Sequence, residues 1–490
     1  MRKLTCGDWA FIGLILVLVF IGFTVVAYSG IDLAKVTVQP GESIQATIDR
    51  AVNGDIVWVA PGTYTENIDF KGKAITVKGI SGPKYTVIDG GCPEVNPDPN
   101  KPTYGSTVRF ISGEGTDSIL EGFTITNGVG TYWVYGQDQC KGAGIFGWGS
   151  GATIRNCHIT GNKTHYHASH QYVYTDVCGG GIYFSRHYYD APKDWWDNVA
   201  PYFDLVIEDC VIEDNWSGEL YPGVGASGVR DLTFRDNTIT GNGLWGPLHV
   251  NESRGFGFYV NTNGEDLSHD SQITISGNKI YGNHAPEYAG KYWCYVARVD
   301  SWDCFCNSIN IDIYNNVIAD NERNCGLFVT GTHQVNIHHN TIHHQWETGG
   351  LGQEGLTVGN LDSDNWAELR VHNNVIWVEN SPDYIHGIID IHGWADAWVS
   401  HNCWNYKEDS GWHNIQWWNL EGDWNMDWEN VVNTEPLLVA PGWPTYDYHL
   451  QLDSPCVGMG VGCQIDVDFE DHGRHVEYPD MGADELVSKQ

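Results

Sequence analysis

Residues 234–242 read FRDNTITGN, and the pattern returns as ISGNKIYGN at 275–283 and IYNNVIADN at 313–321. In each copy an asparagine follows one apolar residue by three positions and precedes another by two. The alternation before the asparagine is the period-two pattern of a β-strand with one buried face. Because the copies recur at unequal intervals, the pattern indicates a repeated core with loops of variable length between the units.

Eight copies align on one anchor position, which is occupied by Cys157, Cys210, Asn237, Asn278, Asn316, Asn340, Asn374 and Asn402. The positions two after, three before and five before the anchor are apolar in all eight, and a further short apolar strand lies upstream of each copy. Three short strands per turn, stacked many times, predict an all-β fold, a single-stranded right-handed parallel β-helix with long corner loops. An antiparallel sandwich is the alternative, but the chain lacks regular hairpin turns and that fold leaves the aligned columns unexplained.

The anchor asparagines are expected at the bend between the second and third strands. There each side-chain amide can bond the same position in the turns above and below. Cys157 and Cys210 share the column, and we expect stacked thiols rather than a disulfide. Two positions before the anchor, Glu208 should lie between Arg155 and Arg235 on neighbouring turns, about 4.8 Å from each.

The composition excludes some partners. The 490 residues include 26 Lys+Arg and 62 Asp+Glu, a net charge of −36. Nucleic acid and anionic membranes require a basic face, so neither is expected as a partner. The same charge disfavours polyanionic sugars unless a cation bridges them. The many glycines (58), tryptophans (22) and tyrosines (25) favour strands, turns and exposed aromatic surface.

The first residues have the pattern of a targeting segment. Arg2 and Lys3 precede an uncharged run over 9–31, and small residues at Ala27 and Ser29 predict a signal peptide cleaved after Ser29. The alternative is an uncleaved membrane anchor, since the run is about long enough to span a bilayer. In both cases the rest of the chain is exported, so we expect a secreted or cell-surface protein with no other membrane contact.

Export makes disulfides possible. Without Cys6 the chain has twelve cysteines, an even number. The first pairs to consider are Cys456 with Cys463 and Cys140 with Cys178.

Both ends of the chain resemble a known family. VTVQPGESIQATIDRAVNGDIVWVAPGTYTENIDF at 36–70 resembles the start of secreted parallel β-helix proteins, a superfamily typified by pectate lyases. There, 45–52 would form a short N-terminal capping helix and IVWVAPGTY the first strand and turn. YDYHLQLDSPCVGMG at 446–460 and IDVDFEDHGRHVEYPDMGADE at 465–485 resemble choice-of-anchor Q segments. The resulting division is a signal peptide or anchor at 1–29, an N-terminal cap and first turns at 30–90, the β-helix with inserted loops at 91–435 and a C-terminal capping segment at 436–490.

The resemblance implies an active groove over the first strand of each turn. Two outward columns are expected there, the first running through Tyr259, Arg298, Phe328, Thr357 and Asp390, the second through Asn261, Asp300, Thr330, Gly359 and His392. The candidate catalytic residues are Asp390, Glu354, Asp300 and Arg298. The candidate substrate-binding residues are Tyr259, Asn261, Phe328, His392, His386 and Trp346, because aromatic faces with polar tips can stack on sugar rings.

Three functions compete for this face. A glycoside hydrolase needs two carboxyls, about 5–5.5 Å apart for retention or about 6.5–9.5 Å for inversion. Asp390 and Glu354 lie on neighbouring turns and fit the larger distance, whereas Asp300 and Asp390 are separated by three turns. A polysaccharide lyase would use Arg298 as the base. The third hypothesis is a non-catalytic cell-surface or adhesive protein that binds glycan. We favour the hydrolase, acting as a monomer on extracellular polysaccharide, because acidic and aromatic groove residues outnumber basic ones.

Metal ligands are not recognisable as a compact motif. No cofactor is predicted firmly, and calcium is the cation that the sequence leaves open, with oxygen ligands available at Asp362, Asp364, Asp466, Asp468 and Glu470. His338, His339, His343 and His344 suggest a transition-metal site. Because these histidines lie on the second and third strands, away from the groove, we expect a solvated histidine ladder instead.

Overall fold

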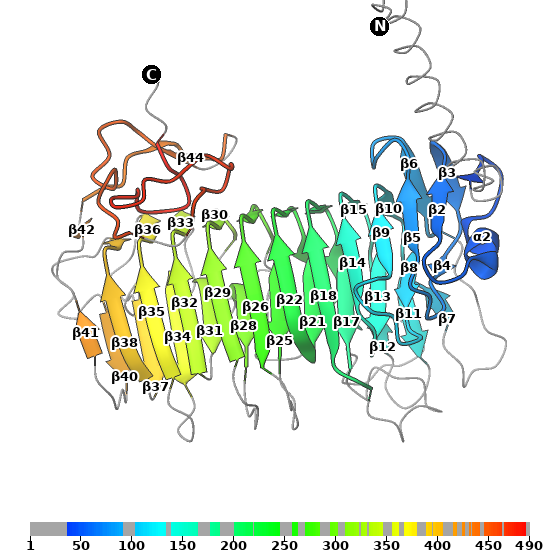
Figure 1. The fold of residues 1–490 in the computed structure, drawn as a ribbon, viewed down its shortest axis with the longest axis horizontal. Coiled ribbons are helices and arrows are strands. Elements are labelled where there is room, and N and C mark those ends of the chain that lie inside the picture. The colour runs from blue at the N-terminus through cyan, green and yellow to red at the C-terminus, as the bar shows by residue number, and fades with distance from the viewer. Residues whose placement is uncertain are drawn as a thin grey trace, which may run out of the picture.

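The chain forms a long solenoid of stacked turns in a computed structural model (Figure 1). The described residues are 37–91, 103–133, 139–164, 177–186, 200–218, 220–245, 257–262, 270–284, 295–301, 309–322, 325–330, 333–345, 355–361, 367–379, 389–393, 395–404, 415–418, 424–426, 431–432, 434–441, 445–462 and 465–486. The candidate residues Glu354, His386 and Trp346 and the targeting segment at 1–29 lie outside these ranges. Within the described residues, no helix has the length and apolar character needed to cross a membrane.

Three parallel sheets form the walls of the solenoid. The first-strand sheet has eleven strands: β4 (Ile68–Asp69), β8 (Val108–Phe110), β13 (Ile145–Trp148), β17 (Ile182–Ser185), β21 (Val224–Ser227), β25 (Phe258–Asn261), β28 (Tyr295–Asp300), β31 (Cys325–Thr330), β34 (Leu356–Leu361), β37 (Ile389–Gly393) and β40 (Ile415–Trp418). The second-strand sheet has thirteen: β1 (Thr37–Val38), β2 (Ile56–Val59), β5 (Thr76–Gly79), β9 (Ile119–Glu121), β14 (Ala152–Arg155), β18 (Phe203–Glu208), β22 (Val229–Arg235), β26 (Ser271–Ser276), β29 (Ile309–Tyr314), β32 (His333–His338), β35 (Ala367–His372), β38 (Ala395–Ser400) and β41 (Trp424–Met426). The third-strand sheet has twelve: β3 (Gly62–Thr65), β6 (Thr86–Asp89), β10 (Thr124–Thr126), β15 (His158–Thr160), β19 (Val211–Glu213), β23 (Thr238–Thr240), β27 (Lys279–Tyr281), β30 (Val317–Ala319), β33 (Thr341–Gln345), β36 (Val375–Glu379), β39 (Cys403–Trp404) and β42 (Val431–Val432).

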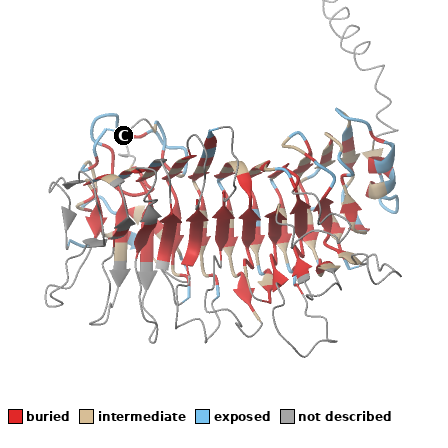
Figure 2. Ribbon diagram, turned by 90° about the horizontal axis from the view of Figure 1, so that it is seen from below, coloured by how far each residue is buried: buried red, intermediate tan, exposed pale blue. Residues whose placement is uncertain are grey.

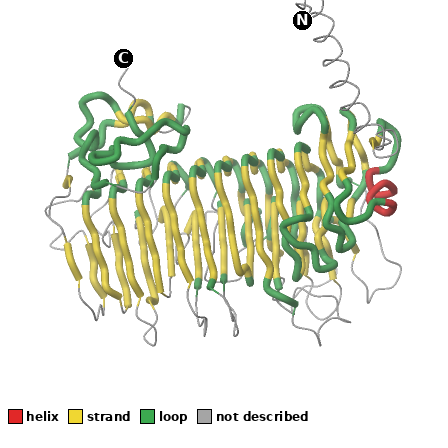
Figure 3. Tube along the Cα trace, in the orientation of Figure 1, coloured by secondary structure: helices red, strands yellow, loops and turns green. Residues whose placement is uncertain are grey.

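Small sheets lie beside these walls. One contains β7 (Thr103–Gly105), β11 (Gly130–Trp133), β12 (Gln139–Lys141) and β16 (Val177–Cys178), another pairs β20 (Trp216–Ser217) with β24 (Gly243–Leu244), and a third pairs β43 (Leu438–Ala440) with β44 (Asp447–Leu450). Strands dominate the described chain, and its helix lies at one end (Figure 3). The predicted all-β parallel β-helix is therefore confirmed. Its apolar core runs along the whole solenoid, with buried residues on every wall (Figure 2).

The N-terminal cap contains helix α2 (Ile44–Arg50), close to the predicted 45–52. Ser43 caps the helix, because its hydroxyl accepts the N–H of Ala46 at 3.0 Å. The Glu66 carboxylate accepts the N–H groups of Ile44 (2.7 Å) and Gln45 (3.2 Å), satisfying two further amides of the first turn. Helix and first turns are thereby joined.

The anchor asparagines form the predicted ladder. From Asn237 to Asn402, each side-chain amide donates to the Oδ1 of the next asparagine at 2.9–3.0 Å. The same Oδ1 also accepts the backbone N–H of the previous asparagine, for example from Asn316 to Asn340 at 3.0 Å. Cys157 and Cys210 continue the column as buried free thiols, as expected.

A second asparagine ladder lies five residues after the first, and the sequence analysis missed it. Its members, joined at 2.9–3.0 Å, are Asn162, Asn215, Asn242, Asn283 and Asn321. The residue before each ladder asparagine has a positive φ, such as Asp236 (56°) and Gly241 (65°). Asn, Asp and Gly tolerate this conformation best, so the recurring GN and DN pairs were the available signal.

Replacing Asn316 by leucine is expected to lower the free energy of unfolding by about 1–3 kcal/mol, because Asn278 and Asn340 would lose partners inside a buried column. Chemical denaturation would measure it. Asn310→Leu is the matched control, since Asn310 lies on the outward face of the same strand. An unchanged midpoint for Asn316→Leu would show that the ladder does not contribute to stability.

The predicted register of the outward charges is also confirmed. Glu208 lies opposite Arg155 and Arg235 on the adjacent strands. Its carboxylate is 2.7 Å from Arg235 and 4.0 Å from Arg155, whose shorter ion pair is with Glu121 at 2.8 Å. Lys78 extends the series at 2.5 Å from Glu121. Opposite charges therefore alternate over five consecutive turns.

Residues 434–441, 445–462 and 465–486, called the C-terminal segment below, pack on the third-strand sheet at the far end of the solenoid (Figure 1). Its apolar side chains, including Leu450, Cys456 and Met481, contact Val317, Val375 and Cys403. Polar anchors join them: Asn315 Nδ2 donates to the Val467 carbonyl at 2.8 Å, and the Ala483 N–H donates to Thr341 Oγ1 at 3.0 Å.

The expectation of a solvated histidine ladder was wrong for the histidines whose side chains are described. His338, His339 and His343 are only 4%, 0% and 1% exposed. The C-terminal segment buries His343, whose ring centroid lies 5.7 Å from that of Tyr448. His338 is instead buried by stacking between Tyr314 and His372. The histidines are parts of packed interfaces, and the side chain of His344 is not described.

Neither predicted disulfide forms, because the described cysteines of both pairs are free thiols. The Cys140 thiol donates to the Val129 carbonyl at 3.2 Å, whereas the Cys178 sulfur lies 3.6 Å from Lys141 Nζ, so the two sulfurs have different partners rather than each other. Cys456 is a buried free thiol that packs in the same apolar cluster as Cys403, so the predicted pairing of Cys456 with Cys463 was wrong.

Candidate functional site

The predicted first outward column lies in register on the first-strand sheet. Tyr259 is opposite Arg298, Arg298 opposite Phe328, Phe328 opposite Thr357, and Thr357 opposite Asp390. In the second column Asn261 is opposite Asp300, and Thr330 opposite Gly359. The alternation along each strand therefore directs the described side chains of both columns, from Tyr259 to Thr357 and from Asn261 to Thr330, to the same face of the sheet.

Arg298 and Asp300 form a buried ion pair on this face. Arg298 Nε lies 2.8 Å and 2.9 Å from the two carboxylate oxygens of Asp300. Only 6% of Arg298 and 2% of Asp300 are exposed. Water screens such a pair little, and each charge depends on the other for compensation.

Aromatic rings enclose the guanidinium of Arg298. Its central carbon lies 4.6 Å from the ring centroid of Phe328 and 5.6 Å from that of Tyr295, and the two rings are 4.3 Å apart. Stacking on aromatic faces and pairing with a carboxylate both stabilise the charged guanidinium. This geometry counts against Arg298 as the base of a lyase and against Asp300 as a catalytic acid.

A similar arrangement lies at the N-terminal end of the same sheet. Arg109 Nε is 3.8 Å from Asp69, and the guanidinium lies 4.5 Å from the ring centroid of Tyr104. Arg109 is 4% exposed. The recurrence supports a structural role for buried arginine–aspartate pairs along this sheet.

Between the two arginines the face is filled by stacked tyrosines. The rings of Tyr183 and Tyr221 are 6.0 Å apart and those of Tyr221 and Tyr259 are 4.4 Å apart, all nearly parallel. Tyr221 lies outside the strands and occupies the space over Gly225, where an added Cβ would meet the tyrosine ring at 2.8 Å. Asn261 Nδ2 donates to the Tyr259 hydroxyl at 3.0 Å, joining two of the predicted binding residues.

This tyrosine stack is closed to solvent. Tyr183, Tyr221 and Tyr259 are 4%, 6% and 2% exposed, and Phe328 is 7% exposed. The sequence analysis missed Tyr221 because it belongs to no repeating column; the signal was a glycine, Gly225, in an otherwise aromatic column between Tyr183 and Tyr259. A glycan could not stack on these rings as they stand.

Two of the remaining candidates, Asp390 and His392, lie on β37. The backbone of β37 places Asp390 opposite Gln416 and His392 opposite Trp418 on β40. The side chains of Asp390 and His392 lie outside the described part of the structure, as do Glu354, His386 and Trp346 entirely. Their catalytic and binding roles stay predictions.

Among the described calcium candidates, Asp468 is occupied by protein contacts. Asp468 Oδ1 accepts the N–H groups of Glu470 (2.8 Å) and His472 (2.9 Å), and Oδ2 accepts that of Glu485 (3.1 Å). Among the described residues, no three His, Cys, Asp or Glu side chains are grouped so that they could hold a metal ion. Asp362 and Asp364 fall outside that part of the chain.

Comparisons with known proteins concern the fold. Solved structures with similarity to this chain are the A-module of the Azotobacter vinelandii mannuronan C-5 epimerase AlgE6 (17% identity over 80% of this chain and 94% of that chain, TM-score 0.43), pectate lyase Pel9A (12%, 91% and 91%, 0.36) and the Agl-KA catalytic domain (14%, 79% and 64%, 0.20). No curated protein matches the sequence. The family model described as the right handed beta helix region matches residues 105–403. The chain belongs to this right-handed β-helix family.

Proposed function

We propose that the chain is an exported polysaccharide-active protein, a glycoside hydrolase that holds glycan against the C-terminal turns of the first-strand sheet. The observation that carries the proposal is the backbone register of β37 and β40, which pairs Asp390 with Gln416 and His392 with Trp418. Aromatic residues suit sugar binding, and Asp390 would supply one of the two carboxyls that glycoside hydrolysis needs, with Glu354 as the candidate for the second.

The buried part of the same face supports this location. From Tyr183 to Phe328 the outward side chains are packed against one another, and the Arg298–Asp300 pair is sequestered. These residues form a rigid support for the following turns rather than the groove itself. Rigid elements hold catalytic groups more precisely than loops do.

A second candidate is a non-catalytic cell-surface protein that binds glycan. The observation in its favour is that Asp300, whose side chain is described, is fully engaged by Arg298. A polysaccharide panel separates the alternatives. New reducing ends without unsaturated products indicate a hydrolase, reducing ends together with unsaturated products indicate a lyase, and saturable binding without either indicates the binding protein.

Replacing Asp390 by asparagine is expected to reduce turnover at least about a hundredfold while folding and glycan affinity stay nearly unchanged, since the substitution removes a proton-transfer group and keeps its shape. Asp231→Asn is the matched control, because Asp231 lies on the second-strand sheet with its side chain 46% exposed. Equal turnover in both variants would remove Asp390 from the mechanism.

A further inference from the structure

A chain of hydrogen bonds crosses from the second-strand sheet to the C-terminal segment. His338 Nε2 lies 3.0 Å from Asp312 Oδ1, His338 Nδ1 lies 3.0 Å from His339 Nδ1, and His339 Nε2 lies 2.9 Å from Asn373 Nδ2. Asp312 is on β29, His338 ends β32, and His339 and Asn373 occupy the corners that follow β32 and β35. These four residues are called the relay.

The C-terminal segment fixes the direction of every bond in the relay. Asn373 Oδ1 accepts the Val461 N–H at 2.9 Å, and Nδ2 donates to the Val461 carbonyl at 2.8 Å, so the amide can have only one orientation. Its second N–H therefore points to His339 Nε2, which must be an acceptor. The proton of neutral His339 is then on Nδ1 and donates to His338 Nδ1, and His338 donates from Nε2 to Asp312.

This arrangement has no place for another proton. A proton on His338 Nδ1 would face the N–H of His339, and a proton on His339 Nε2 would face the Asn373 amide. Either event breaks one bond of the relay. Asn373 also bonds the C-terminal segment directly, because its carbonyl accepts the Gly482 N–H at 2.8 Å in addition to the paired bonds with Val461.

The surroundings oppose a positive charge. Burial, then Arg474 of the C-terminal segment, and then the neighbouring His338 and His372 hold the pKa of His339 well below its ordinary value. Burial, with His338, Arg370 and His401 in the vicinity, lowers the pKa of His372 to about 3. His372 stacks on His338 with ring centroids 5.0 Å apart, and Tyr314 covers the other side of His338 at 5.3 Å. Within the relay, the Asp312 carboxylate contacts His338 and is the negative charge on the solenoid side.

We propose that the relay is a pH-sensitive latch that keeps the C-terminal segment docked on the solenoid only while His339 is neutral. A histidine whose folded pKa is depressed binds fewer protons in the docked state than in the open state. The docked state is therefore fully stabilised above the ordinary histidine pKa of about 6.5 and loses that stability as the pH falls below it.

Buried carboxyls within the C-terminal segment act in the opposite direction. Burial raises the pKa values of Asp480, Asp484 and Glu485, so these groups bind protons more readily when docked. Burial opposes protonation of His449, but its bonds to Asp447 and Glu470 raise its pKa overall. These groups stabilise the docked state at low pH, so the latch must be measured as a difference between the wild type and a relay variant.

Hydrogen exchange on the full chain at pH 7.5 and pH 5, corrected for the intrinsic rate, tests the latch. Between pH 7.5 and pH 5, we expect the protection of peptides covering 461–483 to fall in the wild type. The fall should be at least about tenfold larger than in His339→Gln, whose side chain does not titrate. Peptides covering β26 and β29 should not change. His158→Gln, which removes a half-buried histidine paired with Glu213 outside the C-terminal segment, should behave as the wild type. The same pH response in wild type and His339→Gln would overturn the proposal.

A second variant keeps the test decisive if His339→Gln does not fold. Asp312→Asn preserves an acceptor for His338 but removes the negative charge that favours a protonated imidazole. The loss of protection should then move to lower pH. A shift to higher pH, or none, would also contradict the latch.

Discussion

Replacing Arg298 by methionine is expected to lower the free energy of unfolding by about 3–5 kcal/mol, a larger effect than any exposed ion pair of the chain can produce. Methionine preserves most of the side-chain volume beside the rings of Phe328 and Tyr295, so the change is mainly electrostatic. The loss leaves the carboxylate of Asp300, which is 2% exposed, without the group that contacts both of its oxygens. A buried carboxylate without a counter-charge must either remain desolvated or take up a proton.

The comparison that isolates this effect is Arg230→Met. Arg230 Nε lies 2.7 Å from Asp204 on the second-strand sheet, but both side chains are about one-third exposed, and such pairs contribute about 0–1 kcal/mol. The double variant Arg298→Met/Asp300→Leu should recover much of the lost stability, because it removes both charges. Thermal midpoints and hydrogen exchange of the β28 amides would measure the stability of all three variants. Similar losses of unfolding free energy in Arg298→Met and Arg230→Met would mean that the buried pair stabilises the fold no more than the exposed one.

The solenoid could be predicted from sequence because its determinants repeat. An asparagine that bonds its own copy in the next turn leaves a periodic mark, and so does Glu208 between two arginines. Each turn contacts mainly its neighbours, so a local pattern carries most of the information about the fold. The second ladder leaves an equally periodic mark, because its asparagines recur in GN and DN pairs five residues after the first column.

The candidate site was less predictable because burial depends on segments that do not repeat. Tyr221 lies outside the strands and closes the face over Gly225, so the column alignment could indicate a gap at Gly225 but not the residue that fills it. His343, for example, became buried through contact with Tyr448, which lies more than a hundred positions later in the chain. The alignment of Arg298 and Asp300 in neighbouring columns was correct. Their two-residue spacing also lets the two side chains bond each other. An outward position alone therefore does not distinguish a catalytic acid from a structural one.

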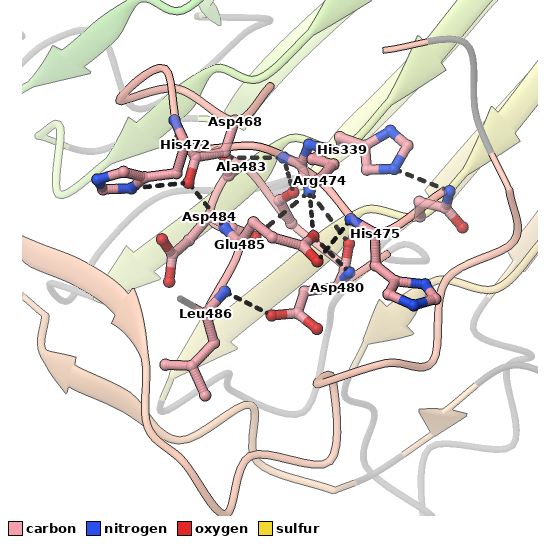
Figure 4. Close-up of polar contacts among 12 residues, drawn as sticks. His339, Asp468, His472, Arg474, His475, Asp480, Ala483, Asp484, Glu485 and Leu486 are labelled. Carbon is pink, nitrogen blue, oxygen red and sulfur yellow. Dashed lines mark hydrogen bonds and ion pairs between the residues drawn. The ribbon is translucent and has the colours of Figure 1, made fainter. Parts of the chain in front are cut away.

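Like Arg298, Arg474 is a buried arginine with a carboxylate partner, and docking of the C-terminal segment is expected to depend on it more than on any other described residue. Its side chain is fully buried and donates to the carbonyls of Gly482 (3.0 Å) and Ala483 (2.8 Å) and to Asn315 Oδ1 on the solenoid (2.9 Å). It also lies 3.3 Å from Glu485. Figure 4 shows it between Asp480, Glu485 and His339, at the centre of the polar contacts under the segment.

Arg474→Met is therefore expected to weaken docking of the C-terminal segment by about 3–5 kcal/mol, because several buried acceptors lose their donor and Glu485 loses its counter-charge. The effect should be confined to one end of the molecule, since turns of a solenoid are stabilised mainly by adjacent turns. Limited proteolysis should then cleave within 434–486 while the solenoid from β2 to β32 stays resistant. Arg474→Lys separates charge from geometry: it keeps the positive charge near Glu485 but cannot reach all the carbonyls, so an intermediate loss is expected. If Arg474→Met left the segment as protease-resistant as the wild type, the apolar contacts of Leu450, Cys456 and Met481 alone would be holding it in place.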